Sequence, residues 1–185
     1  MKYFKVLIIP ILLIAALSIS CERDDICPES TPTTPRLIID FLDATDTDNT
    51  KNVFDLVVIG VDSEDNVSED ALSDYVYTDT DNVILPLKTT ENITEYILVS
   101  DAFENDNDTP DDDSDDFVDG NQDRIQINYS REQVFVSRAC GFKTVFKNVT
   151  LTIVDDGDNW MLSRAPLTDN QSVEDETTTH FNISH

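Results

Sequence analysis

The stretch Arg131–Val154 constrains the fold most, because it carries two apolar runs of strand period around a cysteine–glycine corner. Apolar residues recur at every second position in 134–137 and again in 149–153. A period of two residues is typical of a β-strand with one buried face. At the corner, Cys140 precedes Gly141, which can adopt backbone conformations that other residues avoid. The stretch therefore predicts a β-hairpin on which the rest of the sheet packs.

Further short apolar runs predict additional strands on either side of this hairpin. They lie at residues 37–42, 53–61, 75–77, 83–87, 95–99, 124–129, 160–162 and 180–183. The run 53–61 is the most apolar of them and predicts a central strand buried on both faces. Residues 43–50 have the composition of a turn, and 69–75 that of a polar helical turn.

This pattern, with no convincing amphipathic helix, predicts an all-β fold. We expect a single domain over residues 36–185, an antiparallel β-sandwich of about eight to nine strands and of immunoglobulin-like size. A closed barrel is the alternative, because strand count alone does not separate the two architectures.

The first 20 residues have the order of a bacterial lipoprotein signal peptide. Two lysines precede an apolar run of 14 residues, Val6–Ile19, and Ser20 leads directly into Cys21. That run is short for a membrane span, which needs about 20 residues, but normal for a signal peptide. We therefore expect residues 1–20 to be removed and Cys21 to be acylated. An ordinary secretory signal cut elsewhere is the alternative.

The chain is strongly acidic, with 38 Asp and Glu against 12 Lys and Arg and a net charge of −26 at pH 7. Removing residues 1–20 takes away two lysines and no acid, so 165 mature residues would carry −28. Nucleic acid is excluded as a partner, because phosphate binding requires a basic face. Anionic lipid surfaces repel such a chain. We therefore expect the membrane contact to come from lipid on Cys21, through a proline-containing tether at residues 21–35.

The three cysteines indicate how the domain is tied to this tether. If Cys21 is acylated, Cys27 and Cys140 remain as an even pair in an oxidising compartment, which predicts a disulfide. A nucleophilic Cys140 with His180 or His185 as its base is the alternative, but nothing in the sequence supplies an oxyanion hole. Two thiols and two histidines without close spacing also argue against a zinc site.

Residues 101–123 form the most biased segment, with ten carboxylates and no Lys or Arg in its last twenty residues. Part of it imitates a calcium-binding loop, with Asp115, Asp119 and Asp123 as the expected ligands. Phe117 occupies a ligand position of that pattern, and no glutamate closes it, so calcium binding would be weak. The alternative is a solvated loop held open by charge repulsion. We expect no other cofactor.

Aromatic residues offer a second candidate site, a glycan-binding face. The candidates are Trp160 and the tyrosines at positions 75, 77, 96 and 129. In a β-sandwich such residues more often pack in the core or at its rim, so glycan binding is the weaker hypothesis.

Two motifs give the chain a resemblance to a known family. CERDDIC, residues 21–27, and VSRACGFKTVF, residues 136–146, resemble a family of small Gram-negative outer-membrane lipoproteins classified only as a domain of unknown function. The likeness extends from Cys21 to about Ile183. It implies an outer-membrane lipoprotein with a β-rich domain and no known activity. The acids after Cys21 resemble an export signal, so the periplasmic and the cell-surface face both stay open.

From the sequence we therefore expect an uncharacterised lipid-anchored protein of the bacterial outer membrane. It would act as a binding or structural module and not as an enzyme. Its expected partners are the membrane, through Cys21, and an unknown envelope protein or glycan. An envelope hydrolase or a carbohydrate-binding protein is the alternative, although no phosphate loop, nucleophile elbow or paired-histidine motif supports a hydrolase.

Overall fold

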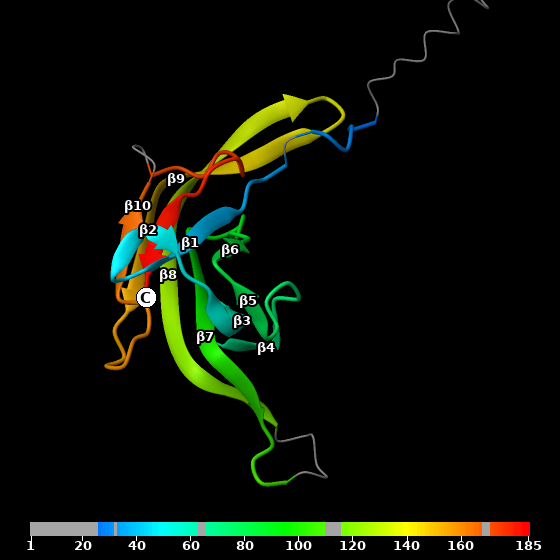
Figure 1. Cartoon of the computed structure of the whole chain (residues 1–185). Helices are drawn as coiled ribbons and strands as arrows, with labels where there is room; N and C mark the ends of the chain where they lie inside the picture. The colour runs from blue at the N-terminus through cyan, green and yellow to red at the C-terminus, as the bar shows by residue number, and fades with distance from the viewer. Residues whose placement is uncertain (1–25, 32, 63–65, 110–115, 168–170) are drawn as a thin grey trace, which may run out of the picture. The chain divides into compact units, whose positions relative to one another are not determined.

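The structure, a computed structural model, describes residues 26–31, 33–62, 66–109, 116–167 and 171–185 (Figure 1). The chain divides into two compact units. Unit 1 contains Met1–Thr31 and Phe135–Phe142, and unit 2 contains Pro32–Val134 and Lys143–His185. The predicted signal peptide and Cys21 lie outside the described residues. The main hydrophobic core belongs wholly to unit 2.

The first sheet of unit 2 is built around β1 (Leu37–Asp43). β11 (Phe181–Ser184) runs parallel to β1, and β10 (Ser163–Pro166) pairs antiparallel with β11. β2 (Asp46–Thr50) and β6 (Asn82–Leu85) are antiparallel partners of β1. The last strand of the chain therefore lies beside the first, and both contribute to one buried face.

The second sheet has the strand order β4–β3–β7–β8–β9, with β5 also paired to β3. Its strands are β3 (Val53–Val61), β4 (Val67–Ala71), β5 (Thr78–Thr80), β7 (Ile93–Asn105), β8 (Phe117–Ser137) and β9 (Gly141–Val154). β7 and β8 pair antiparallel over most of their length, and Figure 1 shows them as long strands that curve side by side. β8 and β9 both continue into unit 1.

The core forms where alternate apolar residues of the two sheets meet. Leu37, Ile39 and Phe41 of β1 are fully buried, as are Ile125 and Ile127 of β8, and all five belong to one cluster. Because two separate sheets pack through one face each, the fold is the predicted all-β sandwich and not a closed barrel.

β3 is buried on both faces in its middle part, as its continuous apolar run predicts, although Phe54 near its start is exposed. Val58 belongs to the main core, whereas its neighbour Val57 packs in a second cluster with Val99 and Ala102 of β7. Gly120 of β8 permits this second cluster to close. Its φ is +144°, and a Cβ at this position would lie 2.8 Å from Val99 Cγ1. Glycine alone therefore allows so close an approach.

Three buried tyrosines hold the segment that leads from β6 of the first sheet to β7 of the second. The hydroxyls of Tyr75, Tyr96 and Tyr129 form hydrogen bonds with the backbone of residues 84, 86 and 88 respectively. The Tyr129 hydroxyl also lies 2.6 Å from Thr94 Oγ1. Alternate backbone groups of β6 and of the segment after it are thus satisfied at part-buried sites, where an unpaired group would be costly.

Two polar strands contradict the sequence predictions. Residues 46–50, predicted as turn, form β2, whose side chains are all exposed and whose sequence therefore carries no apolar period. The helical turn predicted at 69–75 is wrong, because β4 occupies the start of that range and pairs with β3. Both strands are defined by backbone pairing and not by burial.

Strand count and boundaries also differ from the prediction. The described residues form eleven strands and not eight to nine. The strands predicted at 75–77 and 160–162 are wrong, because neither range is a strand; β5 and β10 begin directly after them. The described ranges contain no helix, and hence no helix long and apolar enough to cross a membrane.

Candidate functional site

Unit 1 is built on the tip of the predicted β8–β9 hairpin. Residues 138–140 connect the two strands, and the amide of Cys140 donates a hydrogen bond to Ser137 Oγ at 3.0 Å. Gly141 follows with a φ of +70°, a left-handed conformation that favours glycine. The cysteine–glycine corner is therefore the turn of the hairpin, as predicted.

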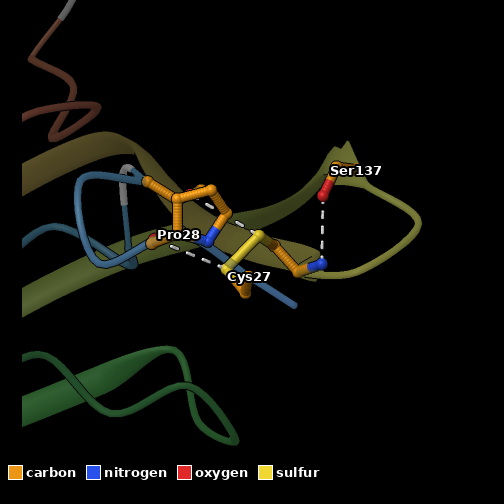
Figure 2. The surroundings of a disulfide bond; sticks show 5 residues. Cys27, Pro28 and Ser137 are labelled. Carbon is orange, nitrogen blue, oxygen red and sulfur yellow. Dashed lines mark hydrogen bonds between the residues drawn. A yellow bond between two sulfur atoms is a disulfide. The ribbon is translucent and has the colours of Figure 1, made fainter. Parts of the chain in front are cut away.

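A disulfide bond joins this turn to the N-terminal segment of unit 1 (Figure 2). The Cα atoms of Cys27 and Cys140 lie 4.9 Å apart, although 113 positions separate them in sequence. Cys27 Sγ lies 3.8 Å from the carbonyl oxygen of Pro28, and the Thr31 hydroxyl lies 3.6 Å from Cys140 Sγ. The predicted pairing is confirmed. In this state Cys140 has no free thiol to act as a nucleophile.

Two phenylalanines flank the turn and pack on each other. Phe135 of β8 and Phe142 of β9 have ring centroids 5.4 Å apart in an edge-to-face arrangement. Their exposed fractions are 59% and 63%, and Ile26, beside the disulfide, is 81% exposed. We call these three residues the apolar tip. The alternating pattern predicts a strand here but does not indicate that these side chains stay exposed.

The acidic segment is a shorter loop than predicted, because strands form its ends. β7 continues to Asn105, which pairs with Phe117 at the start of β8. Asp115 lies outside the described residues. Asp119 accepts hydrogen bonds from Asn105 Nδ2 at 3.0 Å and from the amide of Gly120 at 2.8 Å. In the described part of the chain, no three His, Cys, Asp or Glu side chains are grouped to hold a metal ion. Calcium binding stays a prediction.

Asp123 has a structural role, because its carboxylate bonds the backbone of a segment far along the chain. Its exposed fraction is 0%. Oδ2 accepts a hydrogen bond from the amide of Met161 at 2.7 Å, and Oδ1 accepts one from the amide of Trp160 at 3.3 Å. Burial raises the pKa of this carboxyl, while the two amides act in the opposite direction. Residues 155–162 lead from β9 to β10, so Asp123 fastens the second crossover between the sheets.

The two histidines are also structural groups of unit 2. His180 is 2% exposed, and its Nδ1 accepts a hydrogen bond from the amide of Ile38 at 3.0 Å. His185 packs edge-on against Phe41 and Trp160, at ring-centroid distances of 6.0 and 5.4 Å. Burial lowers the pKa of both imidazoles. Neither serves a thiol nucleophile here, since the two described cysteines are disulfide-bonded.

Acidification should weaken the protein through His180. Burial holds the pKa of its imidazole below the ordinary value, and Asp175 and Glu176 oppose this only in part. As pH falls, the unfolded chain therefore takes up the proton first. The stability that neutral His180 contributes is complete above about pH 6.5 and is lost as pH falls through the folded-state pKa.

His180→Asn tests this, because an asparagine oxygen can accept the Ile38 amide without titrating. Wild type and variant are compared by urea unfolding on both sides of the ordinary histidine pKa. The stability advantage of wild type should shrink at the acidic pH. An advantage that is equal at both pH values would contradict the assignment.

The aromatic residues considered for a glycan-binding face do not form one surface. Tyr75, Tyr96 and Tyr129 are buried, and their hydroxyls bond the first crossover. Trp160 is partly buried against the core and donates its Nε1–H to a carbonyl oxygen of β7 at 3.3 Å. Tyr77 alone among the five has an exposed ring. A stacking platform for sugars is therefore not built from this set.

A shallow pocket of about 360 Å³ lies beside β3, β4 and β7. Its charged lining groups are Asp62, Lys88 and Glu95, which bond to Asn66, Glu91 and Arg124 respectively. The charges of this lining are thus already engaged within the protein.

A known family accounts for most of the chain. A model described as a family of unknown function (DUF6452) matches residues 55–185. The matched range begins in β3 and includes Cys140 and the hairpin turn, but not Cys27. No curated protein and no solved structure matches the chain. The resemblance to a domain family of unknown function is confirmed, whereas lipoprotein character stays a prediction.

Proposed function

Since the chain belongs to this family of unknown function (DUF6452), we propose from its own residues that it is a lipid-anchored protein of the bacterial outer membrane. Its β-sandwich would act as a binding or structural module and not as an enzyme. The disulfide between Cys27 and Cys140 carries the proposal. Disulfides persist in oxidising compartments such as the periplasm and the cell surface. This one ties the segment next to the predicted acylation site to a folded hairpin.

The disulfide also shortens the predicted tether. Only Glu22–Ile26, five residues, separate Cys21 from Cys27. At polyproline spacing they span about 15 Å. Acylation of Cys21 by two or more chains would anchor the protein stably, where one chain is marginal. Unit 1 would then be held close to the membrane surface.

Two groups of unit 2 that could serve in catalysis have structural roles instead, which supports a non-catalytic role. Asp123 fastens a crossover through two backbone amides, and His180 accepts a backbone amide with its Nδ1. The remaining expectation is that the sandwich presents a surface to an envelope protein or a glycan. The acids after Cys21 would direct it to the cell surface if they act as an export signal.

Replacing Cys21 with alanine should abolish acylation. Nearly all of the protein should then leave the membrane fraction or persist as unprocessed precursor, because each buried acyl CH₂ contributes about 0.8 kcal/mol to anchoring. Fractionation of a Gram-negative host and intact mass spectrometry measure this. Cys27→Ser is the matched control, since it removes the disulfide but keeps the acylation residue. A mature wild-type N-terminus that begins at Cys21 without lipid would refute the proposal.

A further inference from the structure

We propose that the apolar tip, Ile26, Phe135 and Phe142, is a second membrane contact that enters the interfacial region of a phospholipid layer. The choice of a lipid surface as the partner rests on the proposed acyl anchor at Cys21. The exposure and the fixed geometry of the tip are independent of that anchor. The protein would thus be attached to the membrane both by the lipid on Cys21 and by the apolar side chains of the tip.

The first observation is that three large apolar side chains share unit 1, whose described residues contribute none of the buried hydrophobic core. Single exposed apolar residues are common on protein surfaces and need no explanation. Here two of the three are in ring contact, at 5.4 Å, and the third precedes a disulfide-bonded cysteine. The disulfide restricts the turn that directly precedes β9 and Phe142, so the pair of phenylalanine rings is presented in a fixed form. A preorganised apolar cluster binds at a lower entropy cost than a mobile one.

The second observation is the charge of unit 1. The whole chain carries −26, but the described residues of unit 1 contain one acid, Glu29, and one base, Arg138. Residues 133–154, which include the turn, hold three basic residues and no acid. The repulsion between this protein and anionic headgroups therefore arises mainly from other parts of the chain. Residues 22–25 of unit 1 add three acids and one base, so the mature unit 1 has four acids and two bases, a net charge of −2 out of −28. Electrostatic opposition to the tip at a lipid surface is therefore small.

The third observation is the length of chain outside the described residues and the place where it ends. From Cys21 the chain reaches Ile26 after four intervening residues, and the disulfide then fixes Cys27 to the turn. An acyl anchor at Cys21 would hold the tip within about 15–20 Å of the lipid layer. Apolar faces of interfacial proteins enter a bilayer by about 5–10 Å. These lengths favour a lipid surface over a protein partner.

Depth-dependent quenching tests the proposal with the mature chain, residues 21–185. With Cys27 and Cys140 bonded, Cys21 carries the one free thiol among the three cysteines. Coupling it to a maleimide phospholipid in phosphatidylcholine vesicles supplies an anchor whether or not cells acylate this residue. Phe142→Trp reports on the tip, wild type with Trp160 alone gives the background, and Phe54→Trp, at a 55% exposed site of unit 2, is the matched control.

With brominated acyl chains, the added emission of F142W should fall by about twofold or more, as for a ring at the headgroup–acyl boundary. Emission of wild type and of F54W should change little. Unquenched F142W would overturn the proposal, and so would equal quenching of F54W. A blue shift of F142W that grows with surface density, without quenching, would assign the tip to contact between copies of the chain and also overturn it.

A partition measurement gives the second arm, with Cys21→Ser protein and no anchor. Phe135→Ser together with Phe142→Ser should lower binding to the same vesicles by roughly tenfold, as expected when two half-exposed rings no longer leave water. Phe54→Ser should leave binding unchanged. Equal binding of the double variant and its parent would overturn the proposal. If cells do not acylate Cys21 but both measurements give the expected results, the proposed anchor is wrong and the membrane contact of the tip is supported. If cells acylate Cys21 but both measurements fail, the anchor is supported and the membrane contact of the tip is wrong.

Discussion

Replacing Asp123 with alanine should lower the free energy of unfolding by about 2–4 kcal/mol, because it leaves one buried and one part-buried amide without an acceptor. These are the amides of Trp160 and Met161, at 3.3 and 2.7 Å from the carboxylate oxygens. Each buried donor left unsatisfied costs about 1–3 kcal/mol. Part of this is offset, because burial raises the pKa of the carboxyl and so already disfavours its charged form. Urea unfolding at neutral pH, followed by Trp160 fluorescence, measures the loss.

Two amide variants show whether the position or the charge matters. Asp123→Asn keeps one acceptor oxygen but turns an NH₂ group toward a backbone donor, so its loss should be intermediate. Asp119→Asn is the matched control on the same strand, where the carboxylate is partly exposed and bonds Asn105 and Gly120. It should stay within about 0.5 kcal/mol of wild type. An alanine variant at 123 as stable as wild type would show that the crossover does not depend on this carboxylate.

The sandwich could be predicted because strands with one buried face have a period of two in their apolar residues. β1 and β8 show this period clearly, and β3 shows the continuous run of a strand buried on both faces. β2 and most of β4 have exposed side chains, so their backbones pair with β1 and β3 without any apolar signal. Strands that are held by backbone hydrogen bonds alone leave no apolar period in the sequence, so the sequence pattern does not predict them.

The same two-residue period in β8 also indicates that Asp123 is buried. Positions 123, 125, 127 and 129 share one face of β8, and the last three are apolar or aromatic core residues. A carboxylate that continues a buried face must find donors inside the fold. The many neighbouring acids favour a different interpretation, a cation site, although the alternation indicates that Asp123 is buried. Its partners Trp160 and Met161 could not be inferred, since they belong to a crossover far along the chain.

The apolar tip could not be predicted for a different reason. The alternation of residues 134–137 is that of a strand whether or not a second sheet covers it. The main core ends within unit 2, and Phe135 and Phe142 lie in unit 1. The disulfide, in contrast, followed from counting cysteines once Cys21 was set aside for lipid. Counting cysteines predicts a disulfide without any knowledge of packing, whereas predicting the exposure of a side chain requires that knowledge.

Reducing the bond between Cys27 and Cys140 should lower the free energy of unfolding by about 2–4 kcal/mol. The sequence separation is 113 residues, and chain entropy sets an upper value of about 4–5 kcal/mol for a closed loop of this size. The measured loss should be smaller than that value, because the bond lies in unit 1 whereas the main core belongs to unit 2. After reduction, unit 1 can gain freedom while the sandwich stays folded, which lowers the cost to the native state.

The loss should therefore be local before it is global. Amide hydrogen exchange should speed up around Cys140, whose amide bonds Ser137 Oγ at 3.0 Å, and around Phe142, while the buried amides of β1 keep their protection relative to the global stability. A variant with serine at both cysteines should match the reduced wild type and should not respond to reductant, which separates loss of the bond from any effect of the reagent. If reduction moves neither the urea midpoint nor the exchange rates at the turn, then the hairpin is held by its own strand pairing. In that case the cross-link serves only to keep the N-terminal segment, and any lipid on it, beside Phe135 and Phe142.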